Sequence, residues 1–342
     1  MELNSNQKKL LNELIKDQEN SSKLFKPGPY WSYKCKKAAD WIYKKGYSDF
    51  RGLTSPVGTS YADGMILDKR NELGLGIKSR LANFISKLPV FKSVYEAQIK
   101  LTEAHIRERI KTKSTLYFNN KRVKYFLENY DLRDTVSFGS VQQLKINQHE
   151  YSFLHLDNID IIDMINKKID LKGINSYFEI GGGFGANIQL LLNNFKNIKK
   201  VLYLDVAPSL FIGTEYLRTY FGNSVKDYLQ LKNKKISFTN DDKLEILCIP
   251  PWVLPDTDLE IDHFHNSCSF AEMTFDIVNN YSKFIKKFLK KGGNISLHLD
   301  RLDNTRYVSN DDMLKMFDLS FSHDEYRDLC DSDFHDLYLL KN

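Results

Sequence analysis

Apolar and polar residues alternate with two different periods along this chain. Up to about residue 135, apolar side chains recur at three- and four-residue spacing, as in Leu81, Phe84, Ile85 and Leu88. That spacing is typical of amphipathic helices, and it predicts helices over residues 7–16, 33–45 and within 77–130. A turn-rich loop at 50–60, with Arg51 as its lone cation, interrupts them. We expect an α-helical N-terminal region over residues 1–135.

From Gly173 onward, the pattern changes to short apolar runs separated by glycine turns and helical segments. This alternation favours an α/β fold with a mostly parallel, Rossmann-like sheet. The closing runs are short and adjacent, which fits an antiparallel C-terminal hairpin. We assign residues 136–342 to this second domain. The strands are expected at 177–180, 201–205, 244–249, 261–265, 294–299, 319–321 and 334–340, with helices beginning near Ala186 and Phe270.

Composition excludes several classes of protein. With 42% hydrophobic and 27% charged residues, the 342-residue chain resembles an ordinary globular protein. It contains no apolar run near the ~20 residues that span a bilayer and no secretory signal pattern, so we expect a cytoplasmic protein without a transmembrane segment. The four cysteines are too far apart for a zinc or disulfide framework. The net charge of +5 is scattered, which does not indicate a nucleic-acid partner.

The most informative segment runs from Tyr177 to Ala186, where an apolar strand ends in a glycine turn and a helix begins. Gly181, Gly182, Gly183 and Gly185 suit either a dinucleotide or S-adenosylmethionine. Glu179 separates the two interpretations. A carboxylate at the mouth of the cleft repels a pyrophosphate and attracts the ammonium and sulfonium groups of S-adenosylmethionine. We therefore predict S-adenosylmethionine as the cofactor.

A second carboxylate, Asp205, ends the next apolar run about twenty residues later. At the end of the second strand of a βαβ unit, it can accept hydrogen bonds from both hydroxyls of a ribose. This property suits both cofactors, so Asp205 marks a nucleoside site without deciding between them.

Polar residues also cluster after the fourth expected strand. His263 and His265 occupy alternating positions and should share one face of that strand, and the segment from Asn266 to Met273 follows it. Ser269 and Glu272 match a capping box, which leaves open whether they cap a helix, line the cleft, or do both. Imidazole titrates near neutrality, so the histidines are candidate proton acceptors, together with His298 and Asp300 at the end of the next strand.

In these motifs the chain resembles the sugar O-methyltransferases of bacterial surface-polysaccharide clusters. The resemblance rests on residues 178–185, on Tyr203 to Asp205, and above all on residues 266–273. It covers roughly residues 135–300. It implies an S-adenosylmethionine-dependent O-methyltransferase acting on a sugar, nucleotide- or lipid-linked. Asp300 stands where that family leads us to expect asparagine, and Pro250-Pro251-Trp252 is unusual, which leaves the catalytic base and the substrate open.

We expect residues Glu179 to Gly185 to hold the methionine part of the cofactor and Asp205 to hold its ribose. The candidate catalytic residues are His265, Glu272, His298 and Asp300, and the candidate substrate ligands are Arg51, Asn266 and Ser269. We assign no metal ligands, although metal-assisted methylation stays open at the carboxylate pairs Asp241-Asp242 and Asp256/Asp258.

Two other classes of protein compete with this hypothesis. An NAD(P)-dependent sugar oxidoreductase would share the glycines and Asp205. Tyr216 and Tyr220 lack the lysine four residues on that many such enzymes carry, whereas Tyr228 has Lys232 at that position. A non-catalytic methyltransferase-like scaffold is the second alternative.

We expect the N-terminal region to cover the acceptor, which we expect to be a saccharide. The same region is a candidate interface for a homodimer.

Overall fold

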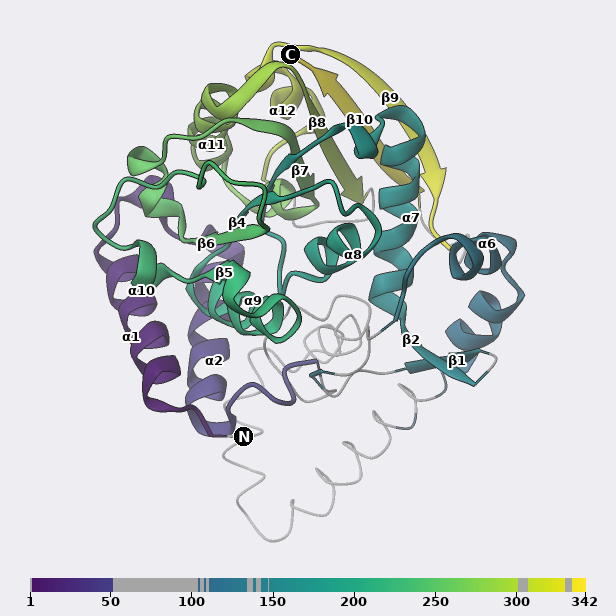
Figure 1. The fold of residues 1–342 in the computed structure, drawn as a ribbon, viewed down its shortest axis with the longest axis horizontal. Helices are drawn as coiled ribbons and strands as arrows, with labels where there is room; N and C mark the ends of the chain where they lie inside the picture. Colours follow the sequence, from purple (N-terminus) through teal and green to yellow (C-terminus); the bar gives the residue numbers. More distant parts are fainter. Residues whose placement is uncertain are drawn as a thin grey trace, which may run out of the picture.

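The computed structural model describes residues 2–51, 104, 108, 111–133, 138–139, 143–146, 148–300, 307–329 and 334–342. Most of the loop expected at 50–60 and most of the helix expected within 77–130 lie outside the described residues. Within them, one eight-stranded sheet forms the centre of the molecule, and helices lie on both of its faces (Figure 1).

The sheet has the strand order β5-β6-β4-β3-β7-β8-β10-β9. The strands from β5 to β8 pair in parallel, and β10 pairs antiparallel with both β8 and β9. This arrangement confirms the predicted Rossmann-like sheet with an antiparallel C-terminal hairpin. The strands are β3 (Ser176–Ile180), β4 (Lys200–Leu204), β5 (Val225–Lys226), β6 (Glu245–Ile249), β7 (Ile261–Ser267), β8 (Leu289–Asp300), β9 (Ser320–Arg327) and β10 (Phe334–Lys341).

The strand order changes direction at β3, the first strand of the sheet in the chain. Its neighbours are β4, which follows it after one helix, and β7, which comes much later. In doubly wound sheets, ligands bind beyond the carboxyl ends of the strands at such a switch point. The switch point therefore places the end of β3 at Ile180, between the ends of β4 and β7, where a ligand is expected.

Alternate residues of β3 face different helices. Tyr177 and Glu179 accept hydrogen bonds from Asn187 of α8, whereas the ring of Phe178 lies 6.3 Å from that of Phe288 in α11. All five residues of β3 are buried, because both faces of the sheet are covered. The helices of this part are α7 (Phe153–Lys168), α8 (Ala186–Asn194), α9 (Ala207–Phe221), α10 (Tyr228–Leu231), α11 (Phe275–Phe288) and α12 (Asn310–Phe317), with 3₁₀ turns η3 (Leu171–Gly173), η4 (Gly222–Ser224), η5 (Pro251–Asp256) and η6 (Ser269–Glu272).

The N-terminal helices α1 (Ser5–Asn20) and α2 (Pro29–Lys45), joined by the turn η1 (Lys23–Phe25), lie against α9 and α10 (Figure 1). Gln7 donates to Glu215 at 2.6 Å, and Gln18 accepts a hydrogen bond from the Ala207 amide at 2.8 Å. The predicted helical character of this region is confirmed. Helix α6 (Lys121–Asn129) and the separate hairpin of β1 (Gln143–Ile146) and β2 (His149–Ser152) contact α7. The predicted domain boundary at residue 135 stays a prediction.

Several predicted bounds were wrong. Helix α11 begins at Phe275 and not near Phe270, β7 continues to Ser267, and β8 begins at Leu289, ahead of Gly292 and Gly293. Leu289 pairs with Ile261, and a register shift between Ile261 and His263 absorbs the extra length. None of the described helices is long and apolar enough to cross a membrane.

Candidate active site

The turn after β3 contains three glycines whose backbone conformation would strain any other residue. Gly181, Gly183 and Gly185 have φ angles of +72°, +62° and +88°, in the region that side chains disfavour. A Cβ on Gly181 would lie 2.2 Å from the Ser269 hydroxyl, whereas a Cβ on Gly183 would meet no atom within 4 Å. The turn is thus pressed against the loop after β7 at Gly181 and open at Gly183.

Glu179 lies beneath this turn, with only 2% of its surface exposed. One carboxylate oxygen accepts a hydrogen bond from Asn187 at 2.9 Å, and the other, Oε2, has no hydrogen-bond partner among the described residues. Burial raises the pKa of Glu179 to about 8, against the opposing effect of Asn187. A buried oxygen without a donor is costly, and a cationic ligand would supply what it lacks.

Asp205 follows β4 and reaches back to the glycine turn. Its Oδ2 accepts from the Gly183 amide at 2.9 Å, and its Oδ1 accepts from the Val206 amide at 2.7 Å. Burial raises the pKa of Asp205 to about 7, although these two amides act in the opposite direction. The structure therefore brings together the turn and the second carboxylate that the sequence singled out. Each carboxylate oxygen retains further acceptor capacity for a ligand.

The loop after β7 is fastened to the end of β3. Asn266 donates to the Ile180 carbonyl at 2.8 Å and to the Ser269 hydroxyl at 2.6 Å, and Ser269 donates to the same carbonyl at 3.2 Å. The capping-box interpretation was wrong: the residue before α11 is Thr274, and the hydroxyl of Ser269 contacts Ile180 instead. Both side chains therefore shape the loop, and a role in orienting a sugar stays a prediction.

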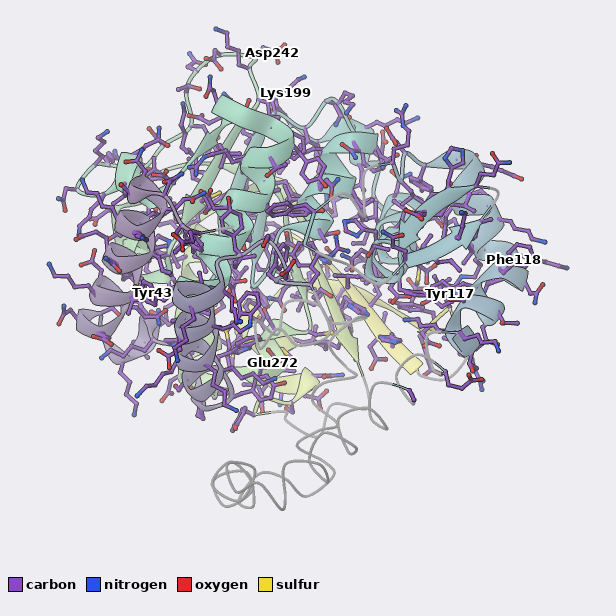
Figure 2. The ribbon with its side chains drawn as sticks, turned by 90° about the horizontal axis from the view of Figure 1, so that it is seen from below. Tyr43, Tyr117, Phe118, Lys199, Asp242 and Glu272 are labelled. Atoms are coloured by element: carbon purple, nitrogen blue, oxygen red, sulfur yellow. The ribbon has the colours of Figure 1, made fainter. Side chains whose placement is uncertain are left out.

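Glu272 ends η6 and is 3% exposed. Trp31 of α2 donates from its indole nitrogen to Glu272 Oε2 at 2.5 Å. The start of α2 also lies close, since a Cβ on Gly28 would come within 3.2 Å of the Glu272 carbonyl. Figure 2 shows Glu272 beside the N-terminal helices, whose ribbon is the faint violet one. The candidate base is thus held by a residue from the other end of the chain.

His263 and His265 share one face of β7, as predicted. Both contact the Ser296 hydroxyl on β8, at 2.9 Å and 2.7 Å, and both stack on Tyr177. They are 0% and 1% exposed, and burial lowers their pKa values to about 3 and about 4. His265 lies inside the sheet layer, two residues before the part-exposed end of β7, and its catalytic role stays a prediction.

His298 lies further toward the carboxyl edge, on β8. Its Nδ1 is 2.7 Å from the Ser267 hydroxyl and 3.7 Å from Cys268 Sγ, and its Nε2 is 3.0 Å from His335 Nδ1. Burial first, and His335 next, lower the pKa of His298 well below its ordinary value. The backbone of Asp300 pairs with His335, while the side chain of Asp300 lies outside the described residues.

Arg51 is fully buried and not at an open loop surface. Its guanidinium donates to Ser152 at 2.6 Å and to the Phe138 carbonyl at 3.3 Å, and lies 4.8 Å from the centre of the Phe184 ring. Phe184 belongs to the glycine turn, so Arg51 supports that turn from below. The phosphate contact predicted for Arg51 stays a prediction, as the loop that follows lies outside the described residues.

The carboxylate pairs considered for a metal have other contacts. Asp241 accepts from Lys200 at 2.9 Å, and Asp258 forms an ion pair with Lys235 at 2.5 Å. The part of the chain that the structure describes contains no group of three or more histidine, cysteine or acidic side chains placed to hold a metal ion.

Sequence reasoning missed three residues of this site: Trp31, Asn187 and His335. Asn187 carried a usable signal, because the first turn of a helix after a glycine turn faces the end of the preceding strand. Trp31 and His335 carried none, since their partners lie 241 and 37 residues away.

Comparisons with known proteins identify no family. No protein-family model and no curated protein matches the chain. Solved structures that it matches include the pyocyanin biosynthetic protein PhzM, with 10% identity, a TM-score of 0.37, and coverage of 52% of this chain and 53% of that one. Two others are the mitomycin 7-O-methyltransferase MmcR (14%, 0.35, 55% and 57%) and a methyltransferase from Pyrococcus furiosus (17%, 0.36, 54% and 82%). The match spans about half the length of PhzM and MmcR.

These TM-scores are too low to carry an argument. The class of fold follows from this chain's own strand order: a doubly wound α/β sheet that ends in an antiparallel hairpin, with a glycine turn and two carboxylates at its switch point.

Proposed function

We propose that the protein is an S-adenosylmethionine-dependent O-methyltransferase that methylates a hydroxyl of a sugar. One observation carries the cofactor assignment. Glu179 Oε2 is buried at the switch point of the sheet without a hydrogen-bond donor among the described residues. The α-ammonium and sulfonium groups of S-adenosylmethionine are the cationic partners that such an oxygen favours.

The residues around the turn fit this cofactor. Glu179 and the amides of Gly181 to Gly185 would hold the methionine part, where the space over Gly183 is open. Asp205 would accept the ribose hydroxyls. When bound, S-adenosylmethionine supplies an electrophilic methyl group. The protein's own task is then to align an alcohol, exclude water and accept one proton.

Glu179 disfavours the oxidoreductase alternative, whereas Asp205 suits the ribose of either cofactor. The Glu179 carboxyl group is buried beneath the glycine turn. A pyrophosphate in that turn would lie close to this carboxylate, and like charges repel strongly where water is excluded. The dinucleotide is therefore the weaker candidate.

Four residues are candidates for the proton acceptor. His298 contacts part-exposed Ser267 and Cys268 at the carboxyl edge of the sheet, and Glu272 ends the η6 turn that follows β7. His265 lies deeper, and Asp300 ends β8. Glu272 and His298 are therefore favoured. The contact of Trp31 with Glu272 supports a role for α2 in excluding water from this edge.

A sugar as the acceptor is supported by the resemblance of residues 266–273 to sugar O-methyltransferases of surface-polysaccharide biosynthesis. A nucleotide- or lipid-linked saccharide would bring a phosphate. Arg51 would serve as its cation once its guanidinium, now buried against Ser152 and Phe184, is uncovered. Asn266 and Ser269 would orient the sugar through the acceptor capacity that their contacts with Ile180 leave.

The cofactor assignment is tested by calorimetric titration with S-adenosylhomocysteine, NADH and NADPH. We expect micromolar binding of the first alone, weakened at least tenfold in Asp205→Ala, because a hydrogen bond to a charged group contributes about 1.5–3 kcal/mol. Asp242→Ala is the matched control, since Asp242 is exposed and distant in sequence from the turn. Binding of a nicotinamide cofactor would overturn the proposal, and binding of none would favour the scaffold alternative.

The acceptor is tested with radiolabelled S-adenosylmethionine and a panel of UDP-, dTDP- and lipid-linked sugars, with catechol as a non-sugar alcohol. Transfer to a member of the sugar panel would support the proposal. Transfer to catechol and to no sugar would contradict the sugar assignment and leave the cofactor assignment standing.

A further inference from the structure

Three polar side chains form a continuous hydrogen-bonded row across the end of the sheet. Ser267 ends β7, His298 lies on β8 and His335 lies on β10. The Ser267 hydroxyl is 2.7 Å from His298 Nδ1, and His298 Nε2 is 3.0 Å from His335 Nδ1. Both nitrogens of the central imidazole are thus engaged, one toward each neighbour.

The row has exposed ends and a buried middle. His298 is 5% exposed, while Ser267 and His335 are part-exposed. Ser267 is the last residue of β7, and it is part-exposed, whereas the four residues before it are buried. It lies two residues before Ser269, which touches Gly181 of the cofactor turn. The row therefore starts two residues from the serine that meets the glycine turn and ends at the part-exposed His335 of β10.

The geometry of the rings keeps the row in place. His298 and His335 stack with centroids 5.1 Å apart and an interplanar angle of 18°. Tyr326 of β9 packs against both rings, with its centroid 5.4 Å from that of His335 and 6.1 Å from that of His298. A neutral imidazole carries one N–H, so if Nδ1 of His298 accepts from Ser267, its Nε2 must donate to His335. The two contacts then form a chain that can pass a proton in one direction.

We propose that Ser267, His298 and His335 form a proton relay that carries the proton of the acceptor hydroxyl to solvent. This inference rests on the proposed function. As the acceptor oxygen bonds to the methyl carbon, the S–CH₃ bond breaks and its electron pair stays on sulfur. The acceptor proton passes to Ser267 Oγ, the Ser267 proton to His298 Nδ1, the His298 Nε2 proton to His335 Nδ1, and the His335 Nε2 proton to water.

The surroundings of His298 keep it ready to accept. Its pKa is lowered by burial, by His335 and by His265 of β7, and raised by Asp336 of β10, with a net direction well below the ordinary value. Neutral imidazole is therefore the dominant form at neutral pH. Cys268, which directly follows β7, and Tyr326 of β9 also face the ring, and Asp160 of α7 acts electrostatically on Tyr326. His335 does not touch the acceptor; it is a positioning residue that acts through His298.

The kinetic test uses His335→Phe, which retains a ring for stacking, and His335→Ala, which leaves room for added imidazole. Turnover is measured with S-adenosylmethionine and the best nucleotide sugar of the panel. We expect kcat to fall by about 10- to 100-fold in both, which is at or below the ~10²–10⁴-fold that a group in direct contact with the acceptor contributes, with unchanged affinity for S-adenosylhomocysteine. Imidazole should restore turnover only in His335→Ala, and exposed His149→Ala should match the unmodified protein.

The relay would be overturned if His335→Ala had the same kcat as the unmodified protein. It would also be overturned if neither imidazole nor a higher pH restored the kcat lost in His335→Ala. A second measurement is independent of the acceptor: ¹⁵N NMR of the imidazole nitrogens in the full chain. We expect protonated Nε2 and unprotonated Nδ1 on His298. The opposite tautomer would overturn the relay even if methylation is observed, whereas failure of S-adenosylhomocysteine to bind would instead refute the proposed function.

Discussion

Trp31 donates a hydrogen bond to Glu272 across 241 residues of sequence, at 2.5 Å between Nε1 and Oε2. The contact joins α2 to the loop after β7, where the proposed chemistry takes place. Glu272 is 3% exposed, so the indole donates to a carboxylate that water hardly reaches. Hydrogen bonds to such groups contribute more than those between neutral partners.

Replacing Trp31 with phenylalanine should therefore destabilise the protein by about 1.5–3 kcal/mol in urea unfolding. The matched control is Trp252→Phe, which removes a 3.1 Å hydrogen bond to the neutral Tyr228 hydroxyl and should cost only about 0.5–1.5 kcal/mol. Equal losses in the two variants would show that the charge of the acceptor contributes nothing.

Glu179 should make the protein less stable as the pH rises. Its pKa is about 8 in the folded chain against 4.5 for the unperturbed group, so between these values the folded state binds the extra proton. Stability gained from this group is then present at low pH and is lost at roughly 1.4 kcal/mol per pH unit as the pH rises toward 8. Glu179→Gln should remove this part of the slope, leave the part that Asp205 contributes below its own pKa of about 7, and be more stable than the unmodified protein at pH 8. Parallel slopes at pH 5–8 would contradict the assignment.

The same carboxyl group should make cofactor binding depend on pH in the opposite sense. A cationic ligand favours ionised Glu179, and the free group must lose its proton first when the pH is below about 8. Affinity for S-adenosylhomocysteine should weaken by about tenfold for each pH unit below 8, until the pKa of the bound state is reached. Calorimetry in buffers of different ionisation enthalpy should detect proton release, and Glu179→Gln should abolish it.

Two glycines of the turn should respond differently to alanine. Both have positive φ, so each substitution should cost about 1–2 kcal/mol from the left-handed conformation alone. Gly181→Ala adds a clash with Ser269, whereas Gly183→Ala meets no atom within 4 Å. We expect Gly181→Ala to destabilise the protein more than Gly183→Ala in thermal unfolding. Adding Ser269→Gly should recover part of the stability lost in Gly181→Ala and none of that lost in Gly183→Ala. A recovery of Gly183→Ala by the same change would refute this explanation.

The sequence predicted the glycine turn after β3 closely because its signals are local. The end of β3 at Ile180, the start of α8 at Ala186 and the position of Asp205 after β4 all follow from apolar runs and glycines within thirty residues. The helical N-terminal region and the antiparallel hairpin were predicted as types of element. The residues at which these elements begin and end differ from the prediction, because strand pairing and helix packing determine them.

The partners of the candidate bases could not be predicted in this way. Ser269 and Glu272 have the spacing of a capping box, yet the Ser269 hydroxyl donates to the Ile180 carbonyl, which the sheet places beside it. Gly292 and Gly293 suggested a break, but β8 continues through them. The bulge beside β7 lies there, the Gly292 amide donates to the Asn342 carbonyl, and the Gly293 carbonyl accepts from the Asn342 amide. Tertiary contacts decided both outcomes, and one sequence does not reveal them.

The packing of α1 has a consequence for the synthesis of the chain. Its buried residues Leu10, Leu11 and Leu14 lie on a helix that packs against α9, and Gln18 meets Ala207 189 residues later. A ribosome adds about 5–20 residues per second. The apolar side of α1 therefore waits about 10–40 s for its partner to emerge, and during that interval a chaperone can bind it.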